Sequence, residues 1–310
     1  MQSNPNILVV TFFVLSNVAF WKIHVYAFVV QLIYAANYSL AKMVMPLYIK
    51  PYAFILVRVL GATLLFFALS FFVKNKKNIA WSDVPKVVFA SLFGVVFNML
   101  LFFKGLSLTT PINASIIMLT APLFVYIFGL FKDGSFIGLK SLFGLILSLS
   151  GALFLVGWGG FSTYSIHMVG NVLILLNAMS YGFYLVYVKK LTEKYSSLSL
   201  IQWLFLSGLV FVLPVGFSEL HQIELSRWSA MVYGILGFVV LGTTFLTYLL
   251  NFEIIKHGGS VLAGSYIYLQ PALATMIAIF LGTDELSNRK IICTFVLILG
   301  LYLINSKKNG

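Results

Sequence analysis

The sequence predicts an all-α polytopic membrane protein, for three reasons. Of its 310 residues, 61% are apolar and 9% are charged, and the mean hydropathy is +1.01. A soluble fold cannot bury that much apolar surface. The run from Phe143 to Val156 is apolar on every face, unlike the alternating strands of a transmembrane β-barrel. α-Helices are therefore the expected spanning elements.

The apolar runs are separated by short polar breaks, and crossing a hydrocarbon core about 30 Å thick takes about 20 residues. We expect ten transmembrane helices, at residues 24–43, 52–73, 86–106, 109–131, 136–157, 168–189, 198–217, 229–252, 258–281 and 288–306. Residues 1–23 are expected to form an N-terminal extension. Its apolar stretch, Ile7–Trp21, is short for a span, and no Lys or Arg precedes it to make a signal peptide. We favour a translation-start extension or an interfacial segment over an eleventh span.

The net charge is +12, and in a membrane protein we interpret the excess of Lys and Arg as a signal that sets the orientation of the chain in the membrane. We therefore expect no nucleic-acid partner. With ten helices, thirteen Lys and Arg residues fall on one side of the membrane and six on the other. The richer side is expected to face the cytoplasm, which places both termini there. The single cysteine, Cys293, excludes an intramolecular disulfide and a cysteine-based metal cluster, and we expect no cofactor or metal.

The chain contains an internal repeat. Shifting it by 149 positions aligns residues 94–157 with 243–306, and places Pro122 on Pro271 and Gly151 on Gly300. A shift of 143 places Tyr38 on Tyr181. We expect a first half at residues 24–157 and a second half at 168–306. Each half has an odd number of helices, so the second half must enter the membrane from the opposite side. Such inverted repeats are typical of secondary transporters.

Several short motifs occur in the same order as in a known family. They are the stretch Tyr34–Lys42, Arg58, Thr120-Ala-Pro122 with its counterpart Leu269-Gln-Pro271, and Gly282–Glu285 before the last helix. In these motifs the chain resembles the drug/metabolite transporter superfamily, in particular EamA-type permeases with two EamA domains. The resemblance implies transport without ATP across a membrane, which we expect to be a bacterial plasma (inner) membrane. The first half departs from the pattern because Phe136 stands where the second half has Glu285.

Polar stripes mark a candidate binding site. Tyr34, Asn37 and Tyr38 share one face of the first helix, and Asn177, Ser180, Tyr181 and Tyr184 share one face of the sixth. These helices occupy equivalent places in the repeat, so the stripes predict a central cavity for an amphipathic solute, with hydrogen bonding that only joins helices as the alternative. The predicted substrate-binding residues are Tyr34, Asn37, Tyr38, Asn98, Asn177, Tyr181, Tyr184, Tyr248, Tyr266 and Gln270.

Arg58 lies within the second helix, where an ionisable residue calls for a functional hypothesis. It is expected either to bind backbone carbonyls or to bind a substrate carboxylate or phosphate. Pro122 and Pro271 are candidate hinges, because each removes a backbone hydrogen bond at a matched depth. No Asp or Glu lies near the centre of a predicted span, which favours facilitated diffusion or exchange over proton antiport.

The sequence lacks a Walker A loop and any constellation typical of catalysis, so we expect neither an enzyme nor an ATP-driven pump. We expect an exporter of small amphipathic metabolites, such as amino acids, that works by alternating access. The alternatives are an exchanger of anionic or phosphorylated metabolites and, in another class, a receptor or structural bundle. The small residues Gly144, Ser148, Gly151 and Ala152 predict helix packing within the first half or a homodimer seam.

Overall fold

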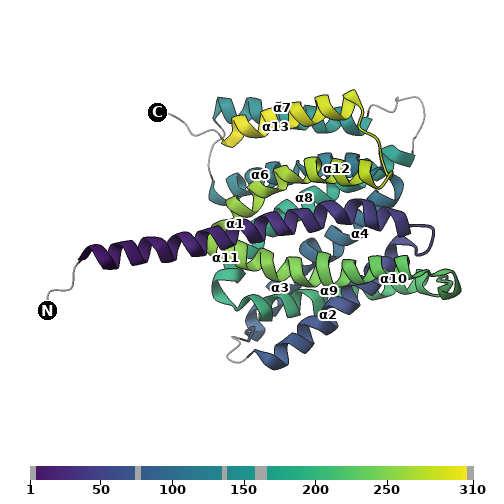
Figure 1. Cartoon of the computed structure of the whole chain (residues 1–310), viewed down its shortest axis with the longest axis horizontal. Coiled ribbons are helices and arrows are strands. Elements are labelled where there is room, and N and C mark those ends of the chain that lie inside the picture. Colours follow the sequence, from purple (N-terminus) through teal and green to yellow (C-terminus); the bar gives the residue numbers. More distant parts are fainter. Residues whose placement is uncertain (1–4, 74–77, 135–137, 158–165, 306–310) are drawn as a thin grey trace.

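The structure is a computed structural model that describes residues 5–73, 78–134, 138–157 and 166–305. Within those ranges the chain forms helices and turns and contains no strand. The long helices lie side by side, and the N-terminal part of α1 extends beyond the rest of the bundle (Figure 1). This arrangement confirms the predicted all-helical fold class.

The first half contains nine helical segments. They are α1 (Pro5–Val44), α2 (Pro51–Phe72), η1 (Trp81–Asp83), α3 (Val84–Ser91), η2 (Leu92–Val96), α4 (Phe97–Leu108), α5 (Pro111–Met118), α6 (Ala121–Asp133) and α7 (Leu139–Gly157). The second half contains α8 (Ile166–Lys194), α9 (Ser197–Leu220), η3 (Leu225–Arg227), α10 (Ala230–Gly237), η4 (Phe238–Leu246), α11 (Thr247–Tyr266), η5 (Ile267–Leu269), α12 (Gln270–Phe280) and α13 (Asn288–Asn305).

Among the described residues, seven helical stretches are long and apolar enough to cross a membrane. They are Trp21–Val44, Pro51–Phe72, Trp81–Leu108, Pro111–Lys132, Ile166–Lys194, Ser197–Leu220 and Ala230–Gly258. Two shorter apolar stretches, Leu139–Leu155 and Ile267–Phe280, correspond to the fifth and ninth expected spans. The count of ten stays a prediction. The residues expected as an N-terminal extension continue directly into the first span, because α1 runs unbroken from Pro5.

Prolines begin helices in this fold. Pro51 and Pro111 lie in the first turn of α2 and α5, where a missing backbone N–H costs nothing. Pro122 and Pro271 occupy the same position in α6 and α12. The expected fourth span is therefore two α-helices with a turn at Leu119 and Thr120, and Pro271 directly follows the 3₁₀ turn η5. Whether either proline acts as a hinge stays a prediction. The turns themselves are where backbone direction can change.

The eighth and ninth expected spans join later than the sequence predicted. Asn251 and Gly258 lie against Tyr34 and Ile23 of α1, so this part of α11 runs antiparallel to α1. Farther on, Gln270 and Thr283 lie against residues 31 and 39 of α1, in the parallel direction. The chain therefore reverses between Gly258 and residue 270, rather than in the polar residues 253–257.

The halves pack with opposite directions along their equivalent helices. In α7 and α13, Gly144 lies beside Gly300 while Gly151 lies beside Cys293, so the two helices are antiparallel. The Ser148 hydroxyl donates to the carbonyl of Leu297 at 3.3 Å. These two residues are 149 positions apart, so they are equivalent in the predicted repeat and are in contact at its symmetry axis. In α2 and α9, Gln202 Nε2 donates to the Phe66 carbonyl at 3.0 Å while Gly216 lies against Leu56. The halves are inverted, and the small residues of α7 pack against the other half rather than within their own.

Candidate functional site

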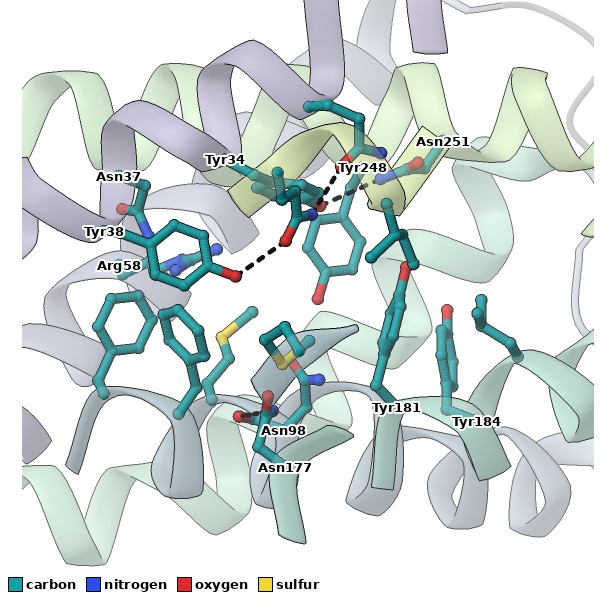
Figure 2. Close-up of a pocket in the computed structure, with 18 of the residues that line it drawn as sticks. Tyr34, Asn37, Tyr38, Arg58, Asn98, Asn177, Tyr181, Tyr184, Tyr248 and Asn251 are labelled. Carbon is teal, nitrogen blue, oxygen red and sulfur yellow. Dashed lines mark hydrogen bonds between the residues drawn. The ribbon is translucent and has the colours of Figure 1, made fainter. Parts of the chain in front are cut away.

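A cavity lies between the halves, bordered by α1, α2, α4, α8 and α11, with α5 and the start of α12 at its edges (Figure 2). Its volume is about 100 Å³, which corresponds to a few water-sized molecules. Its lining comprises Gln31, Tyr34, Asn37, Tyr38, Arg58, Asn98, Met99, Phe102, Phe103, Met118, Asn177, Tyr181, Tyr184, Leu185, Tyr248, Asn251, Phe252, Ile255, Ile267 and Gln270. Both halves contribute, so the cavity is shared.

The structure brings the predicted binding residues to this cavity, with one exception. Tyr34, Asn37 and Tyr38 enter from α1, and Asn177, Tyr181 and Tyr184 enter from α8 (Figure 2). The lining also includes Asn98, Tyr248, Gln270 and Arg58. Whether they bind a substrate stays a prediction.

Tyr266 is the exception, because it is not among the lining residues. Its hydroxyl lies 2.6 Å from His24 Nδ1 of α1, beyond Tyr34 along that helix. Tyr266 lies soon after the chain reversal, close to the end of α11 that Gly258 and Ile23 mark, and so outside the lining. Tyr266 joins α11 to α1 instead of contacting the cavity.

A chain of hydrogen bonds runs along one side of the cavity. The Tyr38 hydroxyl donates to Gln270 Oε1 at 2.8 Å, and Gln270 Nε2 donates to Gln31 Oε1 at 2.6 Å. Asn251 Nδ2 donates to the Tyr34 hydroxyl at 3.0 Å. These bonds join the second half to α1 at three positions. They fix the orientation of these polar groups and offset the cost of their desolvation.

Arg58 is buried, and its guanidinium faces the cavity (Figure 2). Its Nε donates to Thr244 Oγ1 at 2.5 Å and a terminal nitrogen donates to the Thr243 carbonyl at 3.0 Å. The guanidinium carbon lies 4.9 Å from the centre of the Phe103 ring. Among the described residues, no carboxylate forms an ion pair with Arg58. Arg58 therefore binds a backbone carbonyl, and its charge is not balanced by a described carboxylate. That it binds a substrate carboxylate or phosphate stays a prediction.

Two π-helical segments, η2 and η4, supply backbone acceptors to the site. The Gly94 carbonyl of η2 accepts from the Tyr248 hydroxyl at 3.2 Å, and the Thr243 carbonyl of η4 accepts from Arg58. Gly94 and Thr243 are equivalent in the repeat. A π-turn displaces a carbonyl from the regular i−4 pattern and is often found at functional sites. Gly94 is also required sterically, because an added Cβ would lie 2.4 Å from the Tyr184 ring.

Two buried acceptors in the lining lack a hydrogen-bond partner. They are the side-chain oxygens of Asn37 and Asn177. The other end of the Asn177 amide is satisfied, since Nδ2 donates to the Asn98 carbonyl at 2.6 Å. A buried acceptor without a donor costs about 1–3 kcal/mol. The cavity is therefore complementary to a ligand that brings hydrogen-bond donors.

The apolar wall of the cavity was not predicted, because the predicted binding residues were chosen for their polar groups. It consists of Met99, Phe102, Phe103, Met118, Leu185, Phe252, Ile255 and Ile267. Several are equivalent across the repeat, such as Phe103 and Phe252. Gln31 and Asn251 were also missing from the predicted set. Helical spacing could have found both, since Gln31 precedes Tyr34 by three residues and Asn251 follows Tyr248 by three.

Polar contacts at one end of the cavity join α1 to α4 within the first half and join the two halves to each other. Lys42 Nζ donates to the carbonyls of Leu106 at 3.1 Å and Ser107 at 2.8 Å. Farther along, the Thr283 and Ser39 hydroxyls are 3.0 Å apart, and Asp284 accepts from the Ile112 amide at 3.0 Å. Asp284 is also paired with Lys290 at 2.7 Å. The described residues contain no group of three or more His, Cys, Asp or Glu that could hold a metal ion.

These features define a polytopic helical membrane protein with inverted halves around a shared polar cavity. The model of the EamA-like transporter family matches residues 21–157 and 168–306. The chain belongs to this family, within the drug/metabolite transporter superfamily, and is a membrane transporter.

Relatives and solved structures agree with this assignment. The chain is similar to an uncharacterized transporter of Archaeoglobus fulgidus, with 24% identity over 93% of this chain and 99% of the relative. It is also similar to the uncharacterized transporter YcbK of Bacillus subtilis, with 25% identity over 64% of this chain and 65% of that one. A crystal structure with 17% identity superposes with a TM-score of 0.62, covering 92% of this chain and 96% of the other, which shows the fold.

Proposed function

We propose that this protein exports a small amphipathic metabolite, such as an amino acid, through the cavity between its halves. The observation that carries the proposal is the unpaired charge of Arg58 in the same cavity as the unpartnered oxygens of Asn37 and Asn177. A charged group and unsatisfied acceptors are costly inside a membrane protein, so their retention in one cavity supports a ligand role.

The lining suggests how such a solute is held. A carboxylate on the solute would accept from the free guanidinium N–H groups of Arg58. An ammonium or other donor group would satisfy Asn37 or Asn177, and the apolar body would lie against Phe102 and Met99. Binding replaces desolvated, unpartnered groups with satisfied ones. The solute is therefore expected to stabilise the cavity most at the groups that lack partners when it is empty.

The inverted halves supply the movement. In alternating access, the halves rock about a site at their interface so that it opens to one side at a time. Transport then requires the contacts between the halves, Thr283 with Ser39 and Asp284 with the Ile112 amide, to separate in the alternate state. These contacts are hydrogen bonds near a membrane face, worth about 0.5–1.5 kcal/mol net, or about 1.5–3 kcal/mol where a carboxylate accepts, so their exchange is compatible with cycling between two states.

Orientation is part of the proposal. Lysines dominate the face that carries Lys86, Lys132, Lys190 and Lys194, and the positive-inside bias assigns that face to the cytoplasm of a bacterial plasma membrane. Lys42 and Asp284 then close the outer end. The protein acts without catalysis in this proposal, and its partners are the solute and the bilayer. A homodimer remains a separate proposal.

A second candidate function is the exchange of anionic or phosphorylated metabolites. It is favoured by Arg58, whose charge is not balanced by a carboxylate among the described residues. A phosphate would accept from the same guanidinium and would not require an ammonium group on the solute. Arg58→Gln separates the two candidates, because loss confined to anions favours the exchanger.

The test is solute flux in proteoliposomes made with the purified full-length protein. Vesicles loaded with a defined mixture of amino acids and phosphorylated metabolites are assayed by mass spectrometry for efflux. Asn37→Ala and Tyr181→Phe should each lower flux about tenfold while the folded yield is unchanged. Unchanged flux in both variants would contradict the cavity assignment, and flux of no solute by the wild type would favour a receptor or structural role.

A further inference from the structure

A second, larger depression lies on the lysine-rich face, between α6, α8 and the start of α3. Its volume is about 670 Å³. It is lined by Asp83, Lys86, Phe128, Phe131, Lys132, Phe183, Val186, Tyr187, Lys190, Leu191 and Lys194. We call it the lysine groove. It shares no lining residue with the central cavity, so the proposed transport site does not explain it.

The charges in the lysine groove are unbalanced. Asp83 is buried and accepts from Lys86 at 2.7 Å and from Tyr195 at 2.6 Å, and Lys194 also pairs with it. One carboxylate thus faces four lysines in the lining. Lys190 forms no ion pair with a described residue, and Lys132 Nζ donates only to the Val186 carbonyl at 3.3 Å. The groove is therefore complementary to an anion.

The floor of the groove is aromatic. Phe183 of α8 meets Phe128 of α6 edge-on, with ring centres 5.4 Å apart, and stacks on Tyr187 at 5.9 Å. Phe131 is 81% exposed beside them. Lys132 and Lys194 end their spans, whereas Phe128 and Phe183 lie at least one turn deeper in the membrane. The groove is thus charged at the membrane interface and apolar below it.

This vertical order matches one class of molecule. A phospholipid places its phosphate at the interface and its acyl chains in the hydrocarbon, and basic pockets between transmembrane helices bind anionic headgroups. A free phosphate would not need an aromatic floor. We propose that the lysine groove binds an anionic phospholipid, with the phosphate between Lys132 and Lys190 and the acyl chains on Phe128 and Phe131.

The repeat provides an internal comparison. The positions equivalent to Lys132, Lys190 and Lys86 in the other half are Leu281, Leu47 and Ile235. The fold is therefore made without lysines at the matching place, so packing does not require them. The positive-inside rule requires lysines on this face of the membrane but not in a groove. Lys140 and Lys189 lie on the same face and do not line the groove. A bound anionic lipid explains why four lysines line this one groove.

The experiment measures lipid adducts on the full-length protein in detergent by native mass spectrometry. Dioleoyl phosphatidylglycerol is compared with dioleoyl phosphatidylcholine and with sodium phosphate. The wild type should bind phosphatidylglycerol at least tenfold more tightly than phosphatidylcholine. The variant K132Q/K190Q should bind phosphatidylglycerol about 25-fold more weakly, because each lysine near the surface contributes about fivefold. The matched control K140Q/K189Q removes the same charge and should stay within about twofold of the wild type.

Two further arms keep the result decisive. If K132Q/K190Q does not fold, Lys190→Gln alone leaves the hydrogen bond of Lys132 intact and should still weaken phosphatidylglycerol binding about fivefold. Phe131→Ser, at an exposed position, should weaken it about threefold to tenfold by removing apolar contact. Equal binding of the two phospholipids, equal loss in the control, or tight binding of sodium phosphate would overturn the proposal. The last outcome would indicate a free-anion site.

Discussion

Two of the regions where the halves meet differ in how closely their helices pack. Along α7 and α13, Gly144 and Gly300 bring the backbones together, and an added Cβ at either would lie 2.6 Å from the opposite carbonyl. Around the central cavity, long polar side chains keep the helices apart and leave unpartnered groups. A close-packed seam resists separation, whereas a hydrogen-bonded cavity can rearrange at low cost. The comparison suggests that the seam is a fixed pivot and the cavity the moving part.

The largest expected effect comes from breaking the seam. Gly300→Val would place side-chain atoms against the Ser148 hydroxyl and the Gly144 carbonyl, at 2.4 and 2.6 Å for the Cβ alone. Such overpacking against backbone should cost about 3 kcal/mol and lower the thermal unfolding midpoint of the purified protein. Gly129→Val is the matched control, since nothing lies within 4 Å of its Cβ position. If both variants unfold at the same temperature, the seam is not close-packed.

The next effect concerns charge in the cavity. Arg58→Gln keeps a donor for Thr244 but removes the positive charge, so flux of carboxylate-bearing solutes should fall by at least about tenfold. Flux of neutral solutes should change much less. The measurement is efflux from proteoliposomes loaded with both kinds of solute. An equal fall for both would mean that Arg58 serves packing rather than recognition.

A smaller effect is expected from the hydrogen-bond chain. Tyr38→Phe removes the donor to Gln270 Oε1 and leaves a buried acceptor unsatisfied, at a cost of about 1–3 kcal/mol. Transport should fall a few-fold, with a modest drop in the unfolding midpoint. Tyr302→Phe is the control, because Tyr302 is 67% exposed on α13 and remote from the cavity. A Tyr38→Phe variant that behaves like this control would show that the chain of bonds does not order the site.

The smallest effect should follow from Tyr266→Phe. This tyrosine contacts His24 outside the cavity lining, so its hydroxyl should matter little for solute binding. Solute affinity is expected to stay within about twofold of the wild type, since no solute contact is lost. The measurement is the concentration dependence of flux. A large loss of affinity would move the site toward the second half and weaken the distinction between cavity and seam.

Much of the fold could be predicted because a bilayer leaves few choices. Backbone polar groups in hydrocarbon must be paired within a helix, so apolar runs translate directly into spans. The shift of 149 positions that relates the two halves could also be predicted from the sequence, and Ser148 and Leu297, which are in contact, are separated by that same shift. The polar stripe that α8 contributes to the cavity was predictable because Asn177, Tyr181 and Tyr184 share a face at helical spacing.

Other features depended on contacts between distant residues. The π-segments have no local signal, because the displaced carbonyls of Gly94 and Thr243 are stabilised by Tyr248 and Arg58 from other helices. Nothing in the sequence distinguishes Tyr266 from the tyrosines that line the cavity. In the structure it lies against His24, near the chain reversal after Gly258 and outside the lining. The apolar wall around Phe102 could not be distinguished from ordinary core by periodicity.

The sequence by itself determined the membrane class, the all-helical fold and the inverted repeat, because hydrophobicity and chain direction are local or additive properties. Tertiary structure decided which polar groups meet, which acceptors stay unpartnered and where the chain turns. Those outcomes depend on how side chains from separate helices fill a common space, and no single segment carries that information.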